Sequence, residues 1–360
     1  MSRAVAVVGA GAVGTTLAGD LADRGCTVTL YDRDRVGAGA SGRAAGVVYD
    51  AYTDHRDVEL AQRSLERFRA TDAFEPCPYV IVSRTGGTEG PALAALADGM
   101  TDRGVRSTHC DGRRLGERFP AVETRTVADA VVVENAGLVD APAYVDAMAA
   151  RARERGVTVE TGTAVELRGP RTLAVDGRER AFDAVAVTAG AATAALLSAV
   201  GIDIPLGYYR AQVLVTEGVA ASPPSVYDAT DEYYLRPWDG GVLLGDGVDP
   251  TAAPGAWDRG TDPAFRARGR ERLAATLGVS PAIERSWAGL CTATPDRTPM
   301  VGRVAEGLFV ATGFHGHGLL RAPAVAEALA AQLLGASGIS GFDPKRFPAG
   351  ATPTLPTGAE

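Results

Sequence analysis

The sequence predicts an α/β protein in which one α/β domain is interrupted by a second, mainly β-sheet (α+β) domain. A glycine-rich turn joins a buried strand to a helix at the start of the chain. Strand–helix alternation returns around residues 137–206 and again after residue 289. Strand-like patterns dominate much of the chain between these stretches, so the 360 residues are expected to form two domains.

The first 75 residues contain a strand–helix–strand unit followed by a longer helix. Residues 3–8 (RAVAVV) predict a short buried strand, residues 13–24 a helix, and residues 27–32 (TVTLYD) a second strand. In residues 57–74 apolar side chains recur at the spacing of one helix face, so an amphipathic helix is expected there.

The middle of the chain begins less regularly and then returns to a clear helix. Residues 76–136 contain turns rich in glycine and threonine, with strands expected at 79–83 and 130–134. Asp140 is suited to cap the following helix, because its carboxylate can accept a bond from a free N–H group of the first turn. This helix is expected to run to Arg155, just before a glycine.

Strands are expected to dominate the next part of the sequence. Residues 157–161 (VTVET) and 181–190 (AFDAVAVTAG) each predict a strand. From 207 to 289 apolar and polar residues alternate, and WDGG at 238–241 predicts a hairpin turn because glycine and aspartate favour left-handed backbone.

The C-terminal part returns to the α/β pattern. A helix is expected at 265–278, a strand at 307–313 and a helix at 319–334, and the proline-containing tail is expected to be a surface strap or partly disordered. The predicted boundaries are 1–75, 137–206 and 289–340 for the first domain, 76–136 and 207–288 for the second, and 341–360 for the tail.

Composition excludes several classes of function. The net charge is −8 and no basic stripe is present, which argues against a nucleic-acid partner. The sequence contains no run of 18 apolar residues, so no transmembrane segment is expected. The four cysteines lack C-x-x-C spacing, so neither a zinc site nor a disulfide framework is expected, and a reducing cytoplasmic compartment is the default.

The glycine-rich turn predicts a dinucleotide site. Gly9, Gly11 and Gly14 permit a tight turn, close approach to a pyrophosphate, and close packing of helix on strand. Asp32, at the end of the second strand, can accept bonds from ribose hydroxyls. The pattern does not distinguish FAD from NAD. The candidate ligand-binding residues of this part are Gly9, Gly11, Ala12, Val13, Gly14, Asp32 and Arg33.

A second glycine-rich loop follows at 37–48 (GAGASGRAAGVV). Such a loop can supply backbone N–H groups to a further part of an extended ligand; the alternative is a flexible connection. The candidates here are Ala40, Ser41, Arg43, Ala44, Ala45 and Gly46.

Taken in order, several motifs resemble the FAD-dependent D-amino-acid oxidase superfamily, which includes glycine oxidase, sarcosine oxidase, D-amino-acid dehydrogenase and dye-linked proline dehydrogenase. The resemblance covers roughly residues 1–335. The motifs are VVGAGAVG, Asp32, ASGRAAG, GLVDAP, AVAVTAGA, LRPWDGGVLLG, WAGLCTATPDRTPMVG and ATGFHGHGLLRAP.

The resemblance implies extended FAD in a Rossmann-like FAD-binding domain, with the second, mainly β-sheet domain holding the substrate. It places Val165 at the adenine through its backbone, and Ala189 and Gly190 on the strand beneath the cofactor. The loop that opens the last helix would pass the flavin ring with Gly313, Phe314, His315, Gly316, His317, Gly318 and Leu319.

The two histidines of GFHGHGLLRAP (313–323) also allow a metal hypothesis, but no acidic or histidine spacing supplies further ligands. The alternative is a backbone cradle, in which glycines allow close approach and the helix N-terminus stabilises negative charge on reduced flavin. His315 and His317 are then candidates for the substrate pocket or the flavin edge.

The resemblance implies oxidation of an amino acid or an N-methyl or secondary amino acid, by hydride transfer from carbon to flavin N5. The imine product hydrolyses in water. Tyr234 and Arg236 share one strand face, and the guanidinium could bind a substrate carboxylate; a surface arginine is the alternative. Glycine oxidase-like relatives carry an arginine where this chain has Cys291, and some relatives carry a basic residue where it has Gly316, so the usual carboxylate clamp is absent from those positions. Cys291 also leaves a covalent flavin link open.

Other hypotheses about the function stay open at this point. The substrate could be a 2-hydroxy acid or a polyol phosphate, or the chain could be the flavoprotein subunit of a larger dehydrogenase complex. A nicotinamide-only dehydrogenase is a further alternative. The sequence does not decide whether O2 or another acceptor takes the electrons, nor whether the protein is a homo-oligomer.

Overall fold

The computed structural model describes residues 2–84, 90–251 and 254–355 and contains two large sheets. The first is six-stranded, in the order β19-β20-β13-β1-β2-β9, and is parallel except for β19. Its strands are β1 (Ala4–Val8), β2 (Thr27–Tyr31), β9 (Thr158–Glu160), β13 (Ala184–Val187), β19 (Met300–Ala305) and β20 (Leu308–Thr312).

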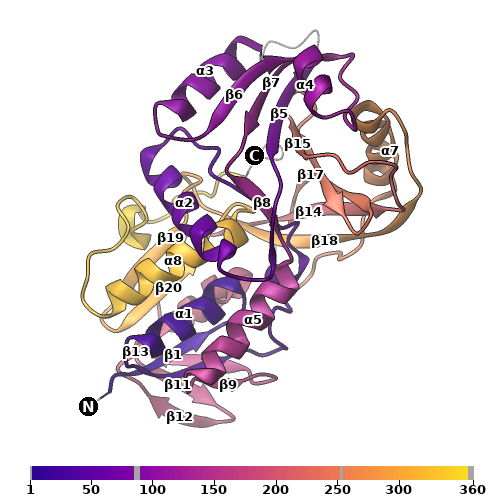
Figure 1. Cartoon of the computed structure of the whole chain (residues 1–360). Helices are drawn as coiled ribbons and strands as arrows, with labels where there is room; N and C mark the ends of the chain where they lie inside the picture. The colour runs from indigo at the N-terminus through magenta and orange to yellow at the C-terminus, as the bar shows by residue number, and fades with distance from the viewer. Residues whose placement is uncertain (1, 85–89, 252–253, 356–360) are drawn as a thin grey trace.

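Helices cover one face of this sheet, in the lower half of Figure 1. Val5 and Val7 of β1 share a core cluster with the helices. The helices are α1 (Ala12–Asp23), α2 (His55–Arg69), α5 (Ala141–Glu154) and α8 (Gly318–Leu333). Alternate residues Ala6 and Val8 point to the other face, so β1 is buried on both sides and its sequence is continuously apolar.

The opposite face of the six-stranded sheet is covered mainly by a small antiparallel sheet. Leu167 and Leu173 pack against Ala6 and Val8. This sheet consists of β10 (Val165–Gly169), β11 (Thr172–Val175) and β12 (Arg178–Ala181), and α6 (Thr193–Ser198) lies beside it.

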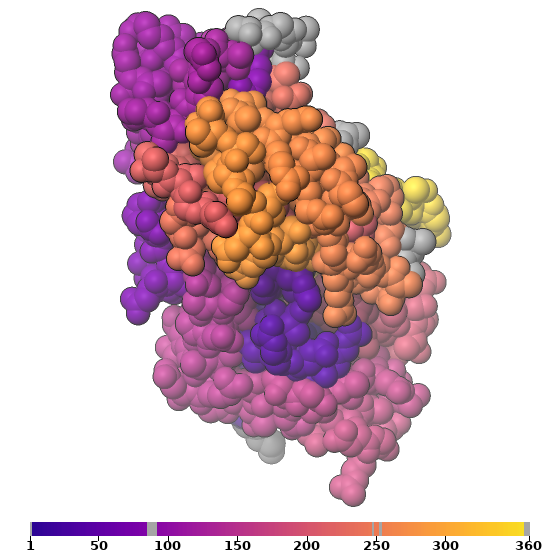
Figure 2. Space-filling model, turned by 90° about the vertical axis from the view of Figure 1, so that its right-hand side faces the viewer, coloured from indigo at the N-terminus to yellow at the C-terminus, as the bar shows by residue number. Residues whose placement is uncertain are grey.

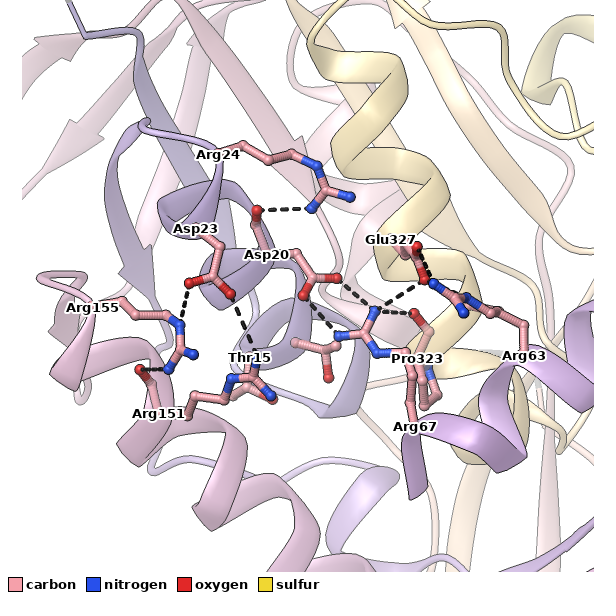
Figure 3. A network of polar contacts seen from close by, with 12 residues as sticks. Thr15, Asp20, Asp23, Arg24, Arg63, Arg67, Arg151, Arg155, Pro323 and Glu327 are labelled. Carbon is pink, nitrogen blue, oxygen red and sulfur yellow. Dashed lines mark hydrogen bonds and ion pairs between the residues drawn. The ribbon is translucent and has the colours of Figure 1, made fainter. Parts of the chain in front are cut away.

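Ion pairs tie the helices of the first domain together (Figure 3). Arg67 of α2 binds Asp20 of α1 at 2.7 Å, and both side chains are largely buried. Arg63 of α2 binds Glu327 of α8 at 2.8 Å. Arg155, just after α5, pairs with the last residue of α1. The bridges connect helices that are far apart in sequence and fix their relative positions.

The second large sheet has eight strands in the order β18-β14-β17-β16-β15-β5-β7-β6. The strands are β5 (Tyr79–Arg84), β6 (Ser107–Asp111), β7 (Val127–Val133), β14 (Gly207–Thr216), β15 (Ser225–Asp228), β16 (Tyr233–Trp238), β17 (Gly241–Pro250) and β18 (Ile283–Ala293). The nearby helices are α3 (Gly90–Thr101), α4 (Gly112–Arg118) and α7 (Pro263–Leu277).

The two faces of the eight-stranded sheet have different partners. Leu214 and Leu244 point to the face that packs against Phe265 of α7. Tyr79 and Ile81 point the other way and belong to the same core cluster as the strands of the first domain. This second face is the one on which the candidate site is built.

A third, three-stranded sheet is formed by segments that connect the two large ones. It consists of β3 (Val47–Tyr49), β4 (Phe74–Pro76) and β8 (Ala136–Val139). Because Phe74–Pro76 pairs with β8, the helix expected over 57–74 ends earlier, at Arg69. That helix prediction was therefore wrong at its C-terminal end.

Several local predictions are confirmed. Asp140 caps α5 by accepting a bond from the Ala143 amide at 3.0 Å. The WDGG turn joins β16 to β17, with positive φ at Asp239 and Gly240 as a two-residue hairpin of this type requires. In the described residues no helix is long and apolar enough to cross a bilayer.

The described part of the tail, residues 341–355, lies against the first domain. Phe342 is fully buried, and its carbonyl accepts a bond from the Val301 amide at 2.8 Å. A short 3-10 turn follows at Pro344–Arg346. Of the two expectations for the tail, a surface strap or partial disorder, residues 341–355 therefore match the surface strap. Residues 356–360 lie outside the described part.

Candidate active site

The glycine-rich turn between β1 and α1 has no room for side chains at two positions. Gly9 has φ +105°, a left-handed backbone that glycine adopts readily. A Cβ on Gly14 would lie 1.9 Å from the Gly9 carbonyl oxygen. The packing of helix on turn thus requires glycine, and helix α1 points its N-terminus, with its partial positive charge, at the end of β1.

Asp32 is fixed immediately beyond β2. Its Oδ2 accepts a bond from the Ala10 amide at 2.7 Å, and its Oδ1 accepts one from the Asp34 amide at 2.8 Å. Its carbonyl accepts a bond from the Thr163 amide at 2.8 Å, which brings Val165 and the start of β10 close to the acid. Arg33 instead pairs with Asp34 at the surface.

The second glycine-rich loop lies against the N-terminus of α1. Ser41 Oγ accepts a bond from the Ala12 amide at 3.0 Å. Arg43 donates to the carbonyl of Ala38 at 2.8 Å, and its own carbonyl accepts a bond from Trp287 of the eight-stranded sheet at 3.3 Å. The predicted loop residues from Ala40 to Gly46 therefore lie between the two domains.

Two further predicted positions, Gly190 and Gly46, are held by close contacts with the backbone or side chains of other segments. Gly190, which follows Ala189 after β13, accepts a bond through its carbonyl from Thr312 Oγ1 at 3.2 Å. A Cβ on Gly46 would lie 2.1 Å from the Val139 carbonyl oxygen, so the chain passes very close there. Figure 2 shows the surface hollowed where the indigo N-terminal segment meets the orange-coloured part of the chain. The glycine cradle, Asp32 and Ser41 together fit an extended dinucleotide.

The inner face of the eight-stranded sheet contributes several polar residues. Tyr227 and Tyr234 are directly opposite each other on β15 and β16, and Tyr209 is opposite Cys291 on β14 and β18. Burial raises the pKa of Cys291 to about 11, although a hydrogen bond with Tyr209 acts against this rise. The Cys291 thiol is therefore protonated at neutral pH and a poor nucleophile, which argues against a covalent flavin link.

The loop before α8 is tied to the end of β18. The Gly313 amide donates to Thr292 Oγ1 at 3.2 Å, and the His315 amide donates to the Thr292 carbonyl at 2.9 Å. Gly313, His315 and Gly316 all have positive φ, and α8 begins at Gly318. Phe314 and Leu319 pack into the core beside this loop.

A cavity of about 250 Å³ lies between this loop, β3 and the inner face of the sheet. The Tyr49 hydroxyl and His317 Nε2 form a hydrogen bond of 3.0 Å. The Tyr49 ring stacks on the Tyr79 ring, with the ring centroids 4.2 Å apart. Burial raises the pKa of both tyrosines, so they are neutral. The lining residues are Tyr49, Ala51, Tyr52, Tyr79, Ile81, Tyr227, Arg297, His315, His317 and Arg321.

His315 is buried in the wall of this cavity. Its Nε2 accepts a bond from the Thr294 amide at 2.7 Å, so the ring proton must be on Nδ1. Burial, and then the charges of Arg321 and Arg297, lower its pKa to about 4. The imidazole is therefore neutral at physiological pH.

The structure brings His315 and His317 into the cavity but does not place Tyr234 or Arg236 among its lining residues. Arg236 is buried elsewhere on the face, where it donates to the Pro237 carbonyl at 3.0 Å and lies 4.4 Å from the Trp238 ring centre. Desolvation lowers its pKa to about 10. A role for Arg236 in binding a ligand within this cavity therefore has no geometric support.

Six polar lining residues were not singled out by the sequence analysis. Their elements are far apart in the chain. Tyr49 and Tyr52 closely follow the second glycine-rich loop, and Arg297 and Arg321 lie inside two of the family motifs, but no spacing marked their side chains as site residues. The missed residues are Tyr49, Tyr52, Tyr79, Tyr227, Arg297 and Arg321. As for metals, no group of three or more His, Cys, Asp or Glu side chains suited to one ion occurs in the described ranges.

The glycine turn, the acid after β2 and the second loop define an α/β protein that binds a dinucleotide. The chain belongs to the FAD dependent oxidoreductase family, whose model matches residues 4–332. FAD is therefore the cofactor and the protein is an enzyme, as the sequence resemblance implied.

Two curated relatives illustrate the family. The chain is 27% identical over 366 residues to 4-methylaminobutanoate oxidase (formaldehyde-forming) of Paenarthrobacter nicotinovorans, covering 94% of this chain and 44% of that protein. It is 26% identical over 351 residues to glycine oxidase of Geobacillus kaustophilus (strain HTA426), covering 89% of each. The chain thus spans less than half of the first relative and most of the second.

Among solved structures, L-proline dehydrogenase from P. horikoshii resembles the chain with a TM-score of 0.87 at 23% sequence identity. The match covers 96% of this chain and 97% of that one. This likeness confirms the predicted fold class, an α/β domain interrupted by a sheet-based one.

Proposed function

We propose that the protein oxidises the C–N bond of an amino acid, or of an N-methyl or secondary amino acid, to an imine that then hydrolyses. When bound, FAD supplies a flavin ring that accepts the hydride. The observation that carries the proposal is the chemistry of the 250 Å³ cavity, whose lining includes arginine, histidine and tyrosine but no carboxylate.

Such a lining favours the reactive form of an amine. Loss of hydride from carbon needs the nitrogen lone pair, so the amine must be neutral. A nearby carboxylate would stabilise the ammonium form, whereas nearby guanidinium groups lower the pKa of a bound ammonium. The neutral tyrosines and His315 add no negative charge, because burial raises the pKa of Tyr49 and lowers that of His315.

The activities for which the two relatives are named support the same class of substrate. One is named for oxidising a methylamino acid and the other for oxidising glycine. We propose O2 or another electron acceptor for the electrons. The four cysteines form no disulfide bonds, which supports a reducing cytoplasmic compartment.

Anaerobic bleaching of the flavin absorption tests this proposal. The purified holoenzyme would be mixed with glycine, sarcosine, 4-methylaminobutanoate, L-proline, D-amino acids and a matched set of 2-hydroxy acids. Bleaching by one or more amines, with the corresponding oxo product and released amine or ammonia, is expected. Bleaching by hydroxy acids alone would show that the enzyme oxidises C–O bonds and that the proposal is wrong.

A further inference from the structure

We propose that His315, Arg321 and Arg297 form an anion subsite of the cavity that holds the carboxylate of the substrate. This inference rests on the proposed function, because it concerns the acid group of an amino-acid substrate. Of these three residues, the sequence analysis had singled out only His315, as a candidate for the substrate pocket or the flavin edge.

His315 supplies a hydrogen-bond donor that requires a partner. The side chain is 6% exposed, and its Nε2 is occupied by the Thr294 amide at 2.7 Å. The proton is therefore on Nδ1, which is buried and has no hydrogen-bond partner among the described residues. A buried donor without a partner costs about 1–3 kcal/mol. Less than 1 Å² of Nδ1 is exposed, so an acceptor on a ligand in the cavity reaches it only if the His315 ring or the cavity wall shifts.

Two guanidinium groups supply the positive charge. Arg321, in the first turn of α8, is 7% exposed, contacts Asp57 at 3.2 Å and lies 5.6 Å from the Tyr52 ring centre. Arg297 is exposed and lines the same cavity from the loop after β18. Arg321, Arg297 and His315 all line this one cavity, and the charge of Asp296 partly offsets the effect of the two arginines on the His315 ring.

Backbone strain supports a functional role for two of these residues. In the described part of the chain five residues other than glycine have positive φ, and His315 (φ 50°) and Arg297 (φ 60°) are two of them. Asp176 and Asp239 belong to tight turns that continue into glycine. Strained backbone of this kind costs about 1–3 kcal/mol and is often found at ligand sites. Here two separate loops contain this strained backbone, and both direct side chains to the same cavity.

The ligand that matches these groups is a carboxylate. A carboxylate offers acceptors to the neutral Nδ1–H and to a guanidinium at once, and the absence of acidic lining residues removes repulsion. The tyrosine rings around it leave an apolar wall for the rest of a small substrate.

Binding of matched acid and amide probes tests the subsite. Acetate and benzoate, and then acetamide and benzamide, would be titrated into the full-length holoenzyme by calorimetry and by the flavin absorption change. We expect each carboxylate to bind at least about tenfold more tightly than its amide, a difference of about 1.4 kcal/mol. Equal affinities for acid and amide would overturn the inference.

Variants assign the preference to the named residues. His315→Phe and Arg297→Gln should each reduce the acid-to-amide ratio at least about fivefold, while Arg297→Lys should keep most of it, because charge is retained. Lys345→Gln, at an exposed position of the tail, is the matched charge control. Should one variant fail to fold by thermal unfolding, the other still decides, and ratios unchanged in the folded variants would contradict the subsite.

Failure of this inference can be told apart from failure of the proposed function. Amines that bleach the flavin without any carboxylate preference would leave amine oxidation standing and refute the subsite. A carboxylate preference in an enzyme whose flavin is bleached only by 2-hydroxy acids would support the subsite and refute amine oxidation.

Discussion

At the scale of single residues, His315 makes the stability of the protein depend on pH. Its pKa is lowered to about 4 in the folded protein, from 6.5 for an ordinary histidine. The unfolded chain therefore takes up the proton first as the pH falls. The associated stability is fully present above about pH 6.5 and is lost progressively as the pH falls to about 4. At about 1.4 kcal/mol per pKa unit it amounts to at most about 3.5 kcal/mol.

Urea unfolding at about pH 7 and about pH 5 measures this contribution. Wild type should lose more free energy of unfolding between these values than His315→Phe, since phenylalanine does not titrate. His55→Gln changes a largely exposed histidine and should keep the wild-type pH dependence. Identical pH dependence in wild type and His315→Phe would show that His315 is not the group responsible.

Residue roles that depend on local geometry could be predicted from the sequence, whereas those that depend on tertiary assembly could not. Gly9, Gly14 and Asp32 act within one strand–turn–helix unit, so their spacing was informative. Arg297 and Tyr49 line the same cavity but are separated by most of the chain. Arg297 lies inside the motif WAGLCTATPDRTPMVG, but in a sequence whose basic residues are nearly all arginine nothing marked its side chain as a site residue.

At the scale of elements, two glycines of α1 should respond in opposite ways to alanine. A Cβ at Gly14 would meet the Gly9 carbonyl oxygen at 1.9 Å and Thr188 Oγ1 at 2.6 Å, so the helix must move away from the turn. Gly14→Ala should destabilise the protein by about 1–3 kcal/mol and reduce bound FAD. At Gly19 the nearest atom is the Ala152 Cα at 4.0 Å, and Gly19→Ala should stabilise the helix by up to about 1 kcal/mol.

Thermal or urea unfolding, together with the ratio of flavin to protein absorption after purification, measures both effects. Gly19→Ala serves as the matched control because it adds the same methyl group to the same helix. Wild-type stability and FAD content in Gly14→Ala would contradict the packing account of the glycine turn.

Elements with strong local signals were predicted well, and those that depend on distant partners were not. The α5 cap at Asp140 and the β16–β17 turn follow from a few neighbouring residues. Strand β6 (Ser107–Asp111) has few apolar residues and is defined by its pairing with β7. Phe74–Pro76 likewise becomes a strand only because β8 is beside it.

At the scale of the whole molecule, the cavity exists because the two domains share one core. Tyr79 of the eight-stranded sheet belongs to the same buried cluster as strands of the first domain, and Tyr227 packs against that cluster. Tyr49 of β3 stacks on Tyr79. Loop 313–318 closes the arrangement through its bonds to Thr292. The sequence predicted two domains and the loop, but the side chains that meet where the domains join depend on the register of strands far apart in the chain.

The C-terminal tail extends this assembly, because it is fastened to the loop that supports the proposed subsite. Arg346 binds both carboxylate oxygens of Asp296, at 2.8 and 2.9 Å. Thr354 donates through its amide to the Thr294 carbonyl at 3.1 Å, and the Thr294 amide in turn holds His315. The tail therefore positions the loop from which Arg297 projects.

Arg346→Gln should weaken binding of acetate and benzoate by about three- to tenfold, or about 0.7–1.4 kcal/mol. The free energy of unfolding should change by only about 1 kcal/mol or less, because the ion pair is partly exposed. FAD content should stay at the wild-type level, since the hydrogen bonds of Arg346 are with Asp296, Thr298 and Asp343 rather than with the glycine turn. Arg346→Lys should recover part of the affinity, and Lys345→Gln should match wild type. Calorimetric titration of the holoenzyme decides: unchanged carboxylate affinity in a folded, FAD-loaded Arg346→Gln protein would mean that the tail covers the surface without positioning the site.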